Sequence, residues 1–246
     1  MQRIEGVASV AMHAMLQEEE PSDFVKLVSI FSQNFGNFPH INPPTVPVSR
    51  YNLINPSEYF THRGFRGETL LNFEVGDCVD KSSPMYQRAI IPIHNSNGSE
   101  VVAHLGRATK DYLRPKFLFT KGFDKRYFLY NYHRAIESAE INSCLFITEG
   151  QGDVWRLFEA GVHNAVSIFG KSLSIDQKAK LIQSGITTLV VLTDNDQAGR
   201  ESKTEIQRQL GRMFNLIFPR MSHKDIGDMP VEKLRLDILS QVRGKF

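Results

Sequence analysis

The feature that most constrains the fold is a regular alternation of apolar runs and amphipathic stretches in the second half of the chain. Four runs have the composition of buried strands, at 144–148, 164–169, 187–193 and 214–218. Four stretches with helical spacing follow them, at 152–160, 174–183, 198–210 and 230–242. Short connections between such strands and helices require parallel strands joined by right-handed crossovers. The sequence therefore predicts an α/β region with a parallel sheet flanked by helices.

Acidic residues stand where three of these predicted strands end. The run 189–192 leads into Asp194 and Asp196, and in an extended chain two residues this far apart point to the same side. Glu149 ends the first strand, and Gly150 leaves room for a ligand. Carboxylates gathered at the carboxyl edge of parallel strands can bind Mg²⁺ and support metal-assisted nucleotidyl transfer. The further candidates for metal binding are Asp153, Asp225 and Asp228.

Local structural roles are the alternative for several of these carboxylates. Asp196 could cap the following helix, and Asp194 could stabilise a turn. Asp153 falls in a first helical turn, where an acidic residue complements the helix dipole in any case. The spacing of "DIGD" leaves open which of Asp225 and Asp228 would bind metal.

A basic segment precedes the predicted parallel sheet. Residues 107–126 contain seven cationic residues and only two aspartates, and aromatic residues are interleaved with the cations. Cations that follow a phosphate backbone, with aromatic rings for base stacking, are typical of single-stranded nucleic-acid binding. The alternative is a solvated surface whose aromatic rings turn into the core. The cations are Arg107, Lys110, Arg114, Lys116, Lys121, Lys125 and Arg126.

Composition narrows the class of protein. With 246 residues, 41% of them hydrophobic, and a net charge of only +2, a polyanion would have to bind a local patch. The two cysteines, Cys78 and Cys144, are far apart, which excludes a Cys-rich zinc ribbon and a disulfide framework. This use of cysteine fits a reducing cytoplasm. No apolar stretch reaches the length of a membrane span, so we expect no membrane contact.

The expected organisation has three parts. Residues 1–48 form a helical segment and a Pro-rich linker, residues 49–140 a smaller mixed α+β basic subdomain, and residues 141–246 the α/β domain. The basic subdomain is expected to contain two short helices and a hairpin that turns near Asn97 and Gly98.

The motifs "LFITEGQGDVWRLFEAGV" and "VVLTDNDQAGR" resemble the TOPRIM fold of primases, topoisomerases and some nucleases. The order of the segments before them is similar to the catalytic core of bacterial and phage DNA primases of the DnaG class. This resemblance extends over residues 50–240 and rests on "YFTHRGFRGETLLNFEVG", on the hairpin beginning at Arg88, and on "PKFLFTKG".

The resemblance implies an enzyme that makes short RNA primers on single-stranded DNA from ribonucleoside triphosphates. It implies Mg²⁺, with Mn²⁺ as a substitute and no zinc, bound by Glu149, Asp194 and Asp196. It assigns template and nucleotide binding to basic residues, and the matching positions here are Arg88, Arg107, Lys116 and Lys121. Arg200, which follows the two aspartates of the third strand, is a further candidate for this binding.

The sequence also departs from that family. It has no Cys or His cluster like that of the family's N-terminal zinc-binding domain. We also expect the family's C-terminal helicase domain to be missing. We therefore expect a replicative helicase and a separate zinc-binding, template-recognising chain as partners, in the cytoplasm of a bacterial host and with a phage genome as one origin. The alternatives are a TOPRIM nuclease and a non-catalytic DNA-binding accessory module of replication.

Overall fold

The computed structural model describes residues 43–244, which belong to one compact unit beginning at Pro43. The predicted N-terminal helical segment at 1–35 lies outside the described residues. Residues 43–52, which include the described end of the predicted linker, form neither helix nor strand. Among residues 43–244 no helix has the length and apolar character needed to cross a membrane.

The first half of the described chain forms an antiparallel sheet. Its strands lie in sequence order, and the predicted hairpin joins the third to the fourth, with Ala89 opposite Arg107. Two short helices accompany it, α3 (Glu58–His62) and α4 (Gly67–Asn72), where the sequence predicts them. The strands are β1 (Leu53–Ile54), β2 (Gly76–Cys78), β3 (Arg88–His94), β4 (Val101–Ala108) and β5 (Phe117–Phe119).

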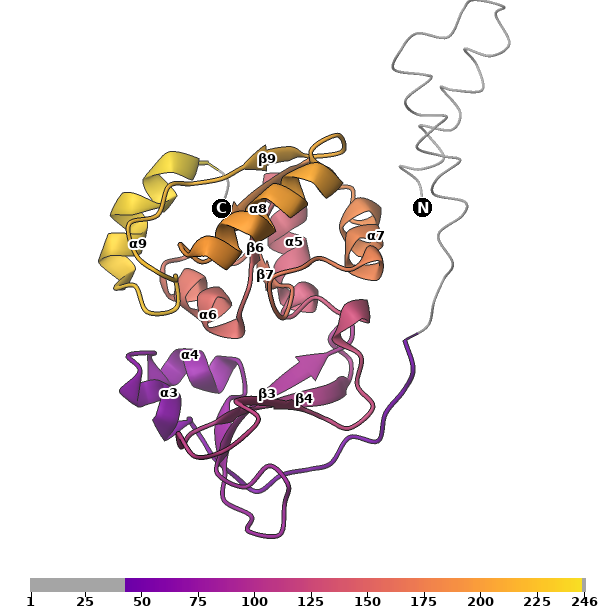
Figure 1. The fold of residues 1–246 in the computed structure, drawn as a ribbon, viewed down its shortest axis with the longest axis vertical. Helices are drawn as coiled ribbons and strands as arrows, with labels where there is room; N and C mark the ends of the chain where they lie inside the picture. The colour runs from indigo at the N-terminus through magenta and orange to yellow at the C-terminus, as the bar shows by residue number, and fades with distance from the viewer. Residues whose placement is uncertain (1–42, 245–246) are drawn as a thin grey trace, which may run out of the picture. The chain divides into compact units, whose positions relative to one another are not determined.

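The second half forms a parallel sheet in the order β7, β6, β8, β9, with all three neighbouring pairs parallel. This confirms the predicted fold class. Its strands are β6 (Cys144–Thr148), β7 (Ala165–Ser167), β8 (Thr188–Leu192) and β9 (Asn215–Ile217). Figure 1 shows helices around this sheet and the antiparallel sheet beside its lower end. The helices of this half are α5 (Tyr132–Asn142), α6 (Gln151–Glu159), α7 (Ile175–Gln183), α8 (Gln197–Leu210) and α9 (Val231–Asp237). Short 3₁₀ turns lie at Lys125–Tyr127 and Leu239–Val242.

Local sequence explains where several helices begin. The Ser174 hydroxyl accepts a hydrogen bond from the Gln177 amide, and the Gln177 side chain accepts one from the Ser174 amide, which forms a capping box at the start of α7. Asp196 caps α8 in the same way, by accepting from the Gly199 amide at 2.8 Å. The segments that follow the parallel strands begin at the same edge of the sheet, so the polar side chains in them lie at that edge.

One hydrophobic core joins the two halves. The inner face of the antiparallel sheet, with Ile91 and Leu105, belongs to the same buried cluster as Phe146 and Val190 of the parallel sheet. Trp155 on α6 is fully buried in this cluster, and the rings of Phe60 and Phe65 meet it edge on, with centroids 4.8 and 5.4 Å away. The two halves therefore share a packed interior. The predicted boundary at residues 140 and 141 stays a prediction.

Candidate active site

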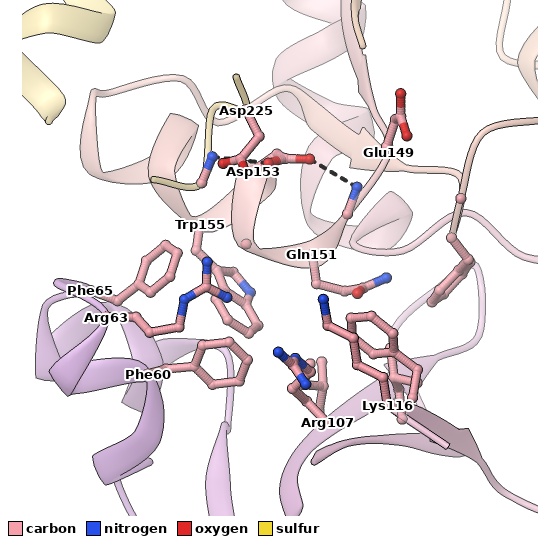
Figure 2. Close-up of a pocket in the computed structure, with 18 of the residues that line it drawn as sticks. Phe60, Arg63, Phe65, Arg107, Lys116, Glu149, Gln151, Asp153, Trp155 and Asp225 are labelled. Atoms are coloured by element: carbon pink, nitrogen blue, oxygen red, sulfur yellow. Dashed lines mark hydrogen bonds between the residues drawn. The ribbon is translucent and has the colours of Figure 1, made fainter. Parts of the chain in front are cut away.

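A cavity of about 410 Å³ lies where the carboxyl edge of the parallel sheet faces the antiparallel sheet. Its carboxylates come from the parallel half and its cations from the 58–127 region, and Figure 2 shows the labelled members of the two groups on opposite sides. We call the first group the acidic wall: Glu149, Asp153, Asp194 and Asp225. We call the second group the basic wall: Arg63, Arg107, Lys116 and Lys125.

Glu149 and Asp194 form the centre of the acidic wall. They follow the neighbouring strands β6 and β8, and the Asp194 amide donates a hydrogen bond to the Glu149 carboxylate at 3.1 Å. Burial raises the pKa of Glu149, and the neighbouring Asp194 carboxylate adds to this rise. Burial and the charge of Asp225 likewise raise the pKa of Asp194. The structure thus places the two residues side by side at the strand ends, and the coupling of their carboxylates has an electrostatic cost that a bound cation would relieve.

Asp153 is bound to backbone on both sides. One carboxylate oxygen accepts from the Gly150 amide at 2.9 Å and the other from the Gly227 amide at 3.0 Å (Figure 2). Burial raises the pKa of Asp153 to about 7. Asp153 therefore links the turn after β6 to the loop that carries Asp225, and both of its oxygens already have partners.

The two aspartates of "DND" have different surroundings. Asp194 lines the cavity, whereas the Asp196 carboxylate accepts from the Gly199 amide and lies 3.5 Å from the Lys171 ammonium. The hydrogen bond from the Gly199 amide and the positive charge of Lys171 lower the pKa of Asp196. Gly199 is required here, since a Cβ on it would lie 1.8 Å from the Asp194 carbonyl oxygen. The capping alternative for Asp196 is thus present in the structure beside a cavity-facing Asp194.

The two aspartates of the third acidic motif, "DIGD" at 225–228, also have different surroundings. Asp225 lines the cavity and accepts a hydrogen bond from the Asp228 amide at 2.9 Å. Asp228 instead pairs with Arg63. Of these two candidates, the structure brings Asp225 to the other carboxylates.

The acidic wall can hold a metal only through a small number of carboxylates. Among residues 43–244 no group of three or more His, Cys, Asp or Glu side chains is arranged to hold a metal ion. Mg²⁺ usually takes one or two protein carboxylates and completes its octahedron with water and phosphate oxygens. Glu149 and Asp194, adjacent and partly desolvated, fit that requirement in their donor chemistry.

Two of the predicted basic residues line the cavity. The Arg107 guanidinium lies over the rings of Tyr59 and Phe117, 5.4 and 5.2 Å from their centroids. The Lys116 ammonium lies 5.8 Å from the Phe117 ring, which is 46% exposed. Of the aromatic residues in the basic segment, Phe128 is buried, whereas Phe117 and Tyr112 remain accessible for stacking. Both interpretations of the aromatic residues thus hold for part of the set.

Three predicted binding residues do not line the cavity. Arg88 is only 3% exposed, and its guanidinium donates to the carbonyls of Pro115, Arg114 and Gly106, so it supports the turn before β5. Arg200 is exposed and donates to the Gln197 side chain at 3.0 Å. Lys121 is exposed in the turn after β5.

Three further cations lie near the carboxylates, and of these sequence reasoning missed Arg63 and Lys171, whereas it named Lys125 only as a member of the basic segment. Arg63 ends α3 and lines the cavity, and Lys125 reaches the Phe169 carbonyl at 2.7 Å. Lys171, in the loop after β7, lowers the pKa of Glu149, Asp194 and Asp196. Lys125 stands in the basic segment and Lys171 at the carboxyl edge of the sheet, so both had a positional signal. Arg63 had none beyond the motif that contains it.

Comparison with known proteins supports this architecture. Residues 143–217 match the model of the Toprim domain. The DNA primase of Helicobacter pylori strain J99 is 29% identical over 158 residues, which are 61% of this chain and 28% of that protein. The chain thus spans less than a third of the length of that relative.

Solved primase structures share the fold. The Aquifex aeolicus primase, comprising its zinc-binding and RNA polymerase domains, matches with a TM-score of 0.64 and 22% identity, over 76% of this chain and 53% of that one. A DnaG primase catalytic domain bound to single-stranded DNA matches with a TM-score of 0.59 and 20% identity, over 75% of this chain and 70% of that one. Residues 143–217 are therefore a Toprim domain, set in a chain that is similar in sequence and fold to the catalytic cores of DnaG-type DNA primases.

Proposed function

We propose that this chain synthesises short RNA primers on single-stranded DNA by metal-dependent nucleotidyl transfer. The observation that carries the proposal is the cavity, in which carboxylates from neighbouring parallel strands face cations of the antiparallel half. Nucleotidyl transfer needs this combination, because its transition state spreads negative charge over the transferred phosphorus and the leaving pyrophosphate.

The chain's own residues divide the work between the two walls. Glu149 and Asp194 would hold the catalytic cation, Asp225 lies in the same acidic wall, and Asp196 fixes the turn that presents Asp194. Bound Mg²⁺, or Mn²⁺ in its place, supplies polarisation of the α-phosphate and a lower pKa for the attacking 3′ hydroxyl. Arg107, Lys116 and Lys125 neutralise the triphosphate and the template backbone, and Phe117 offers a ring for stacking.

The proposed substrates are single-stranded DNA as template and ribonucleoside triphosphates. A replicative helicase and a separate zinc-binding, template-recognising chain are the proposed protein partners. The proposed location is the cytoplasm of a bacterial host, with a phage genome as one origin of the chain. The resemblance to primase cores supports these assignments, since solved relatives include one with a zinc-binding domain and one bound to single-stranded DNA.

A direct assay tests the proposal. The purified chain is incubated with single-stranded template, labelled ribonucleotides and Mg²⁺, and short products formed without a starting oligonucleotide are resolved on a gel. We expect such products from the wild-type chain and from Asp176→Asn, whose carboxylate lies in the first turn of α7 and outside the cavity. EDTA or Asp194→Asn is expected to abolish them.

Two other outcomes would contradict primer synthesis. Cleavage of the template with Mg²⁺ or Mn²⁺ in the absence of nucleotides would indicate a TOPRIM nuclease. DNA binding that is unchanged by EDTA, without synthesis or cleavage, would indicate a non-catalytic module.

A further inference from the structure

Arg156 on α6 is a buried cation that does not line the cavity. Its side chain is 7% exposed, and it forms an ion pair with Glu159 at 2.6 Å, whose own side chain is 1% exposed. A buried ion pair of this kind is retained only where hydrogen bonds satisfy both groups, so the remaining contacts of the guanidinium are informative.

Two of those contacts hold the third acidic loop. The Nε and Nη2 atoms of Arg156 both donate to the Gly227 carbonyl, at 3.3 and 3.2 Å. The amide of the same residue, Gly227, donates to the carboxylate of Asp153. Side chains one turn apart on α6 thus bind both polar groups of Gly227, which lies between Asp225 and Asp228 in the chain.

The other contacts of Arg156 reach the antiparallel half. Its Nη1 atom donates to the Gly64 carbonyl at 3.1 Å, and its guanidinium lies 4.5 Å from the centroid of the Phe65 ring. Glu159 extends this connection, because its second oxygen accepts from the Arg66 amide at 2.7 Å. Gly64 has a left-handed backbone, with φ of +85°, and directly follows the cavity-lining Arg63.

We propose that Arg156 is a positioning residue that sets Asp225 of the acidic wall and Arg63 of the basic wall at a fixed separation across the cavity. It acts through the backbone carbonyls of Gly227, two residues after Asp225, and of Gly64, which directly follows Arg63. Only a planar guanidinium, with several donors in a rigid fork, can bind both carbonyls and Glu159 at once, and a lysine ammonium cannot. The inference rests on the proposed function for its catalytic readout.

The test compares two variants of Arg156 with a matched control. Arg156→Lys keeps a positive charge beside Glu159, and the double variant Arg156→Met with Glu159→Gln removes both buried charges together. Arg235→Lys is the control, because the Arg235 guanidinium also donates to a backbone carbonyl near Arg156, that of Ala160, and neither Arg235 nor Ala160 lines the cavity. Thermal unfolding establishes the folded fraction to which each rate is normalised.

Two readouts separate positioning from a merely structural role. In primer synthesis we expect both Arg156 variants to need a several-fold higher Mg²⁺ concentration for half-maximal rate, with a loss of about tenfold in the rate at saturation. By hydrogen exchange we expect the amides of residues 225–228 to exchange at least tenfold faster than in the wild type. Arg235→Lys should match the wild type in both.

Each readout can overturn the inference independently. Unchanged exchange at 225–228 in both Arg156 variants would refute positioning even if the wild type makes primers. An unchanged Mg²⁺ midpoint and saturated rate in folded variants would do so as well. If the wild type made no primers, the proposed function would fail, and the exchange measurement would still decide whether Arg156 holds the loop.

Discussion

The two walls of the cavity are built differently. In the acidic wall three carboxylates accept hydrogen bonds from backbone amides. Glu149 accepts from the Asp194 amide, Asp153 from the amides of Gly150 and Gly227, and Asp225 from the Asp228 amide. In the basic wall the Arg107 guanidinium lies over aromatic rings and donates one hydrogen bond, to the Ala108 carbonyl at 3.0 Å, and Figure 2 shows it beside Lys116 on the opposite side of the cavity. Carboxylates bound to backbone have little freedom, whereas long cationic side chains over rings can follow a ligand. The acidic wall is therefore the fixed reference of the site, and Arg107 and Lys116 are the adjustable part of the basic wall, whereas Arg63 and Lys125 are held by Asp228 and by the Phe169 carbonyl.

The largest effect is expected from the centre of the fixed wall. Glu149→Gln should lower primer synthesis by about 10³-fold or more, because it removes a charge from the candidate metal ligands while keeping an acceptor for the Asp194 amide. Glu205→Gln, at an exposed carboxylate of α8, should leave the rate unchanged. The measurement is the initial rate at saturating nucleotide and Mg²⁺.

A smaller loss is expected from the adjustable part of the basic wall. Arg107→Ala should reduce the rate by about 10²-fold, since other cations can still approach the phosphates. It should also reduce the slope of log affinity against log salt for single-stranded DNA by about 0.7, the value for one lost phosphate contact. Arg212→Ala, at an exposed site outside the cavity, serves as the control. A loss as large as that of Glu149→Gln would remove the distinction between the walls.

The fixed wall should also be sensitive to packing at its turn. Gly199→Ala would place a methyl group against the Asp194 backbone, so we expect about 2–3 kcal/mol of destabilisation in urea unfolding. Gln197→Ala, an exposed change in the same helical turn, should cost less than about 0.5 kcal/mol. Equal stabilities of the two variants would show that the turn can relax.

The smallest predicted effect is a dependence of stability on pH. Burial raises the pKa of Asp153 to about 7, so the folded state binds this proton more tightly than the unfolded chain, whose aspartates titrate near 4. The resulting stability is fully present below about pH 4 and is lost as the pH rises through 7. Without metal, the wild type should lose about 1–2 kcal/mol more than Asp153→Asn between pH 6 and 8. Parallel urea titrations at the two pH values check this, and equal losses would contradict it.

The parallel half could be predicted from sequence because its signals are local. Buried runs such as 189–192 and a cap such as Ser174 fix the strands and helices, and strand ends fix the position of Glu149 and Asp194. The short strands β1, β2 and β5 of the antiparallel sheet escaped prediction, since two or three residues show no periodicity.

The basic residues were harder to assign because their partners are distant in the chain. Arg88 has a side chain that can bind phosphate, yet it is buried and its guanidinium donates to the carbonyls of the turn at 114–115. Arg63 meets Asp228 across 165 positions, a pairing that no local pattern can indicate. Residue type predicted the charge of the basic wall, and only the tertiary structure shows which cations form it.

The burial of Trp155 gives the molecule a built-in optical reporter. It is the one tryptophan in the sequence, it lines the cavity, and its indole N–H donates to the Tyr130 hydroxyl at 2.9 Å. Phe60 and Phe65 of the antiparallel half enclose it from the other side. Its fluorescence emission should therefore shift to longer wavelength when the halves separate and water enters, which allows their association to be followed in the native chain without any dye.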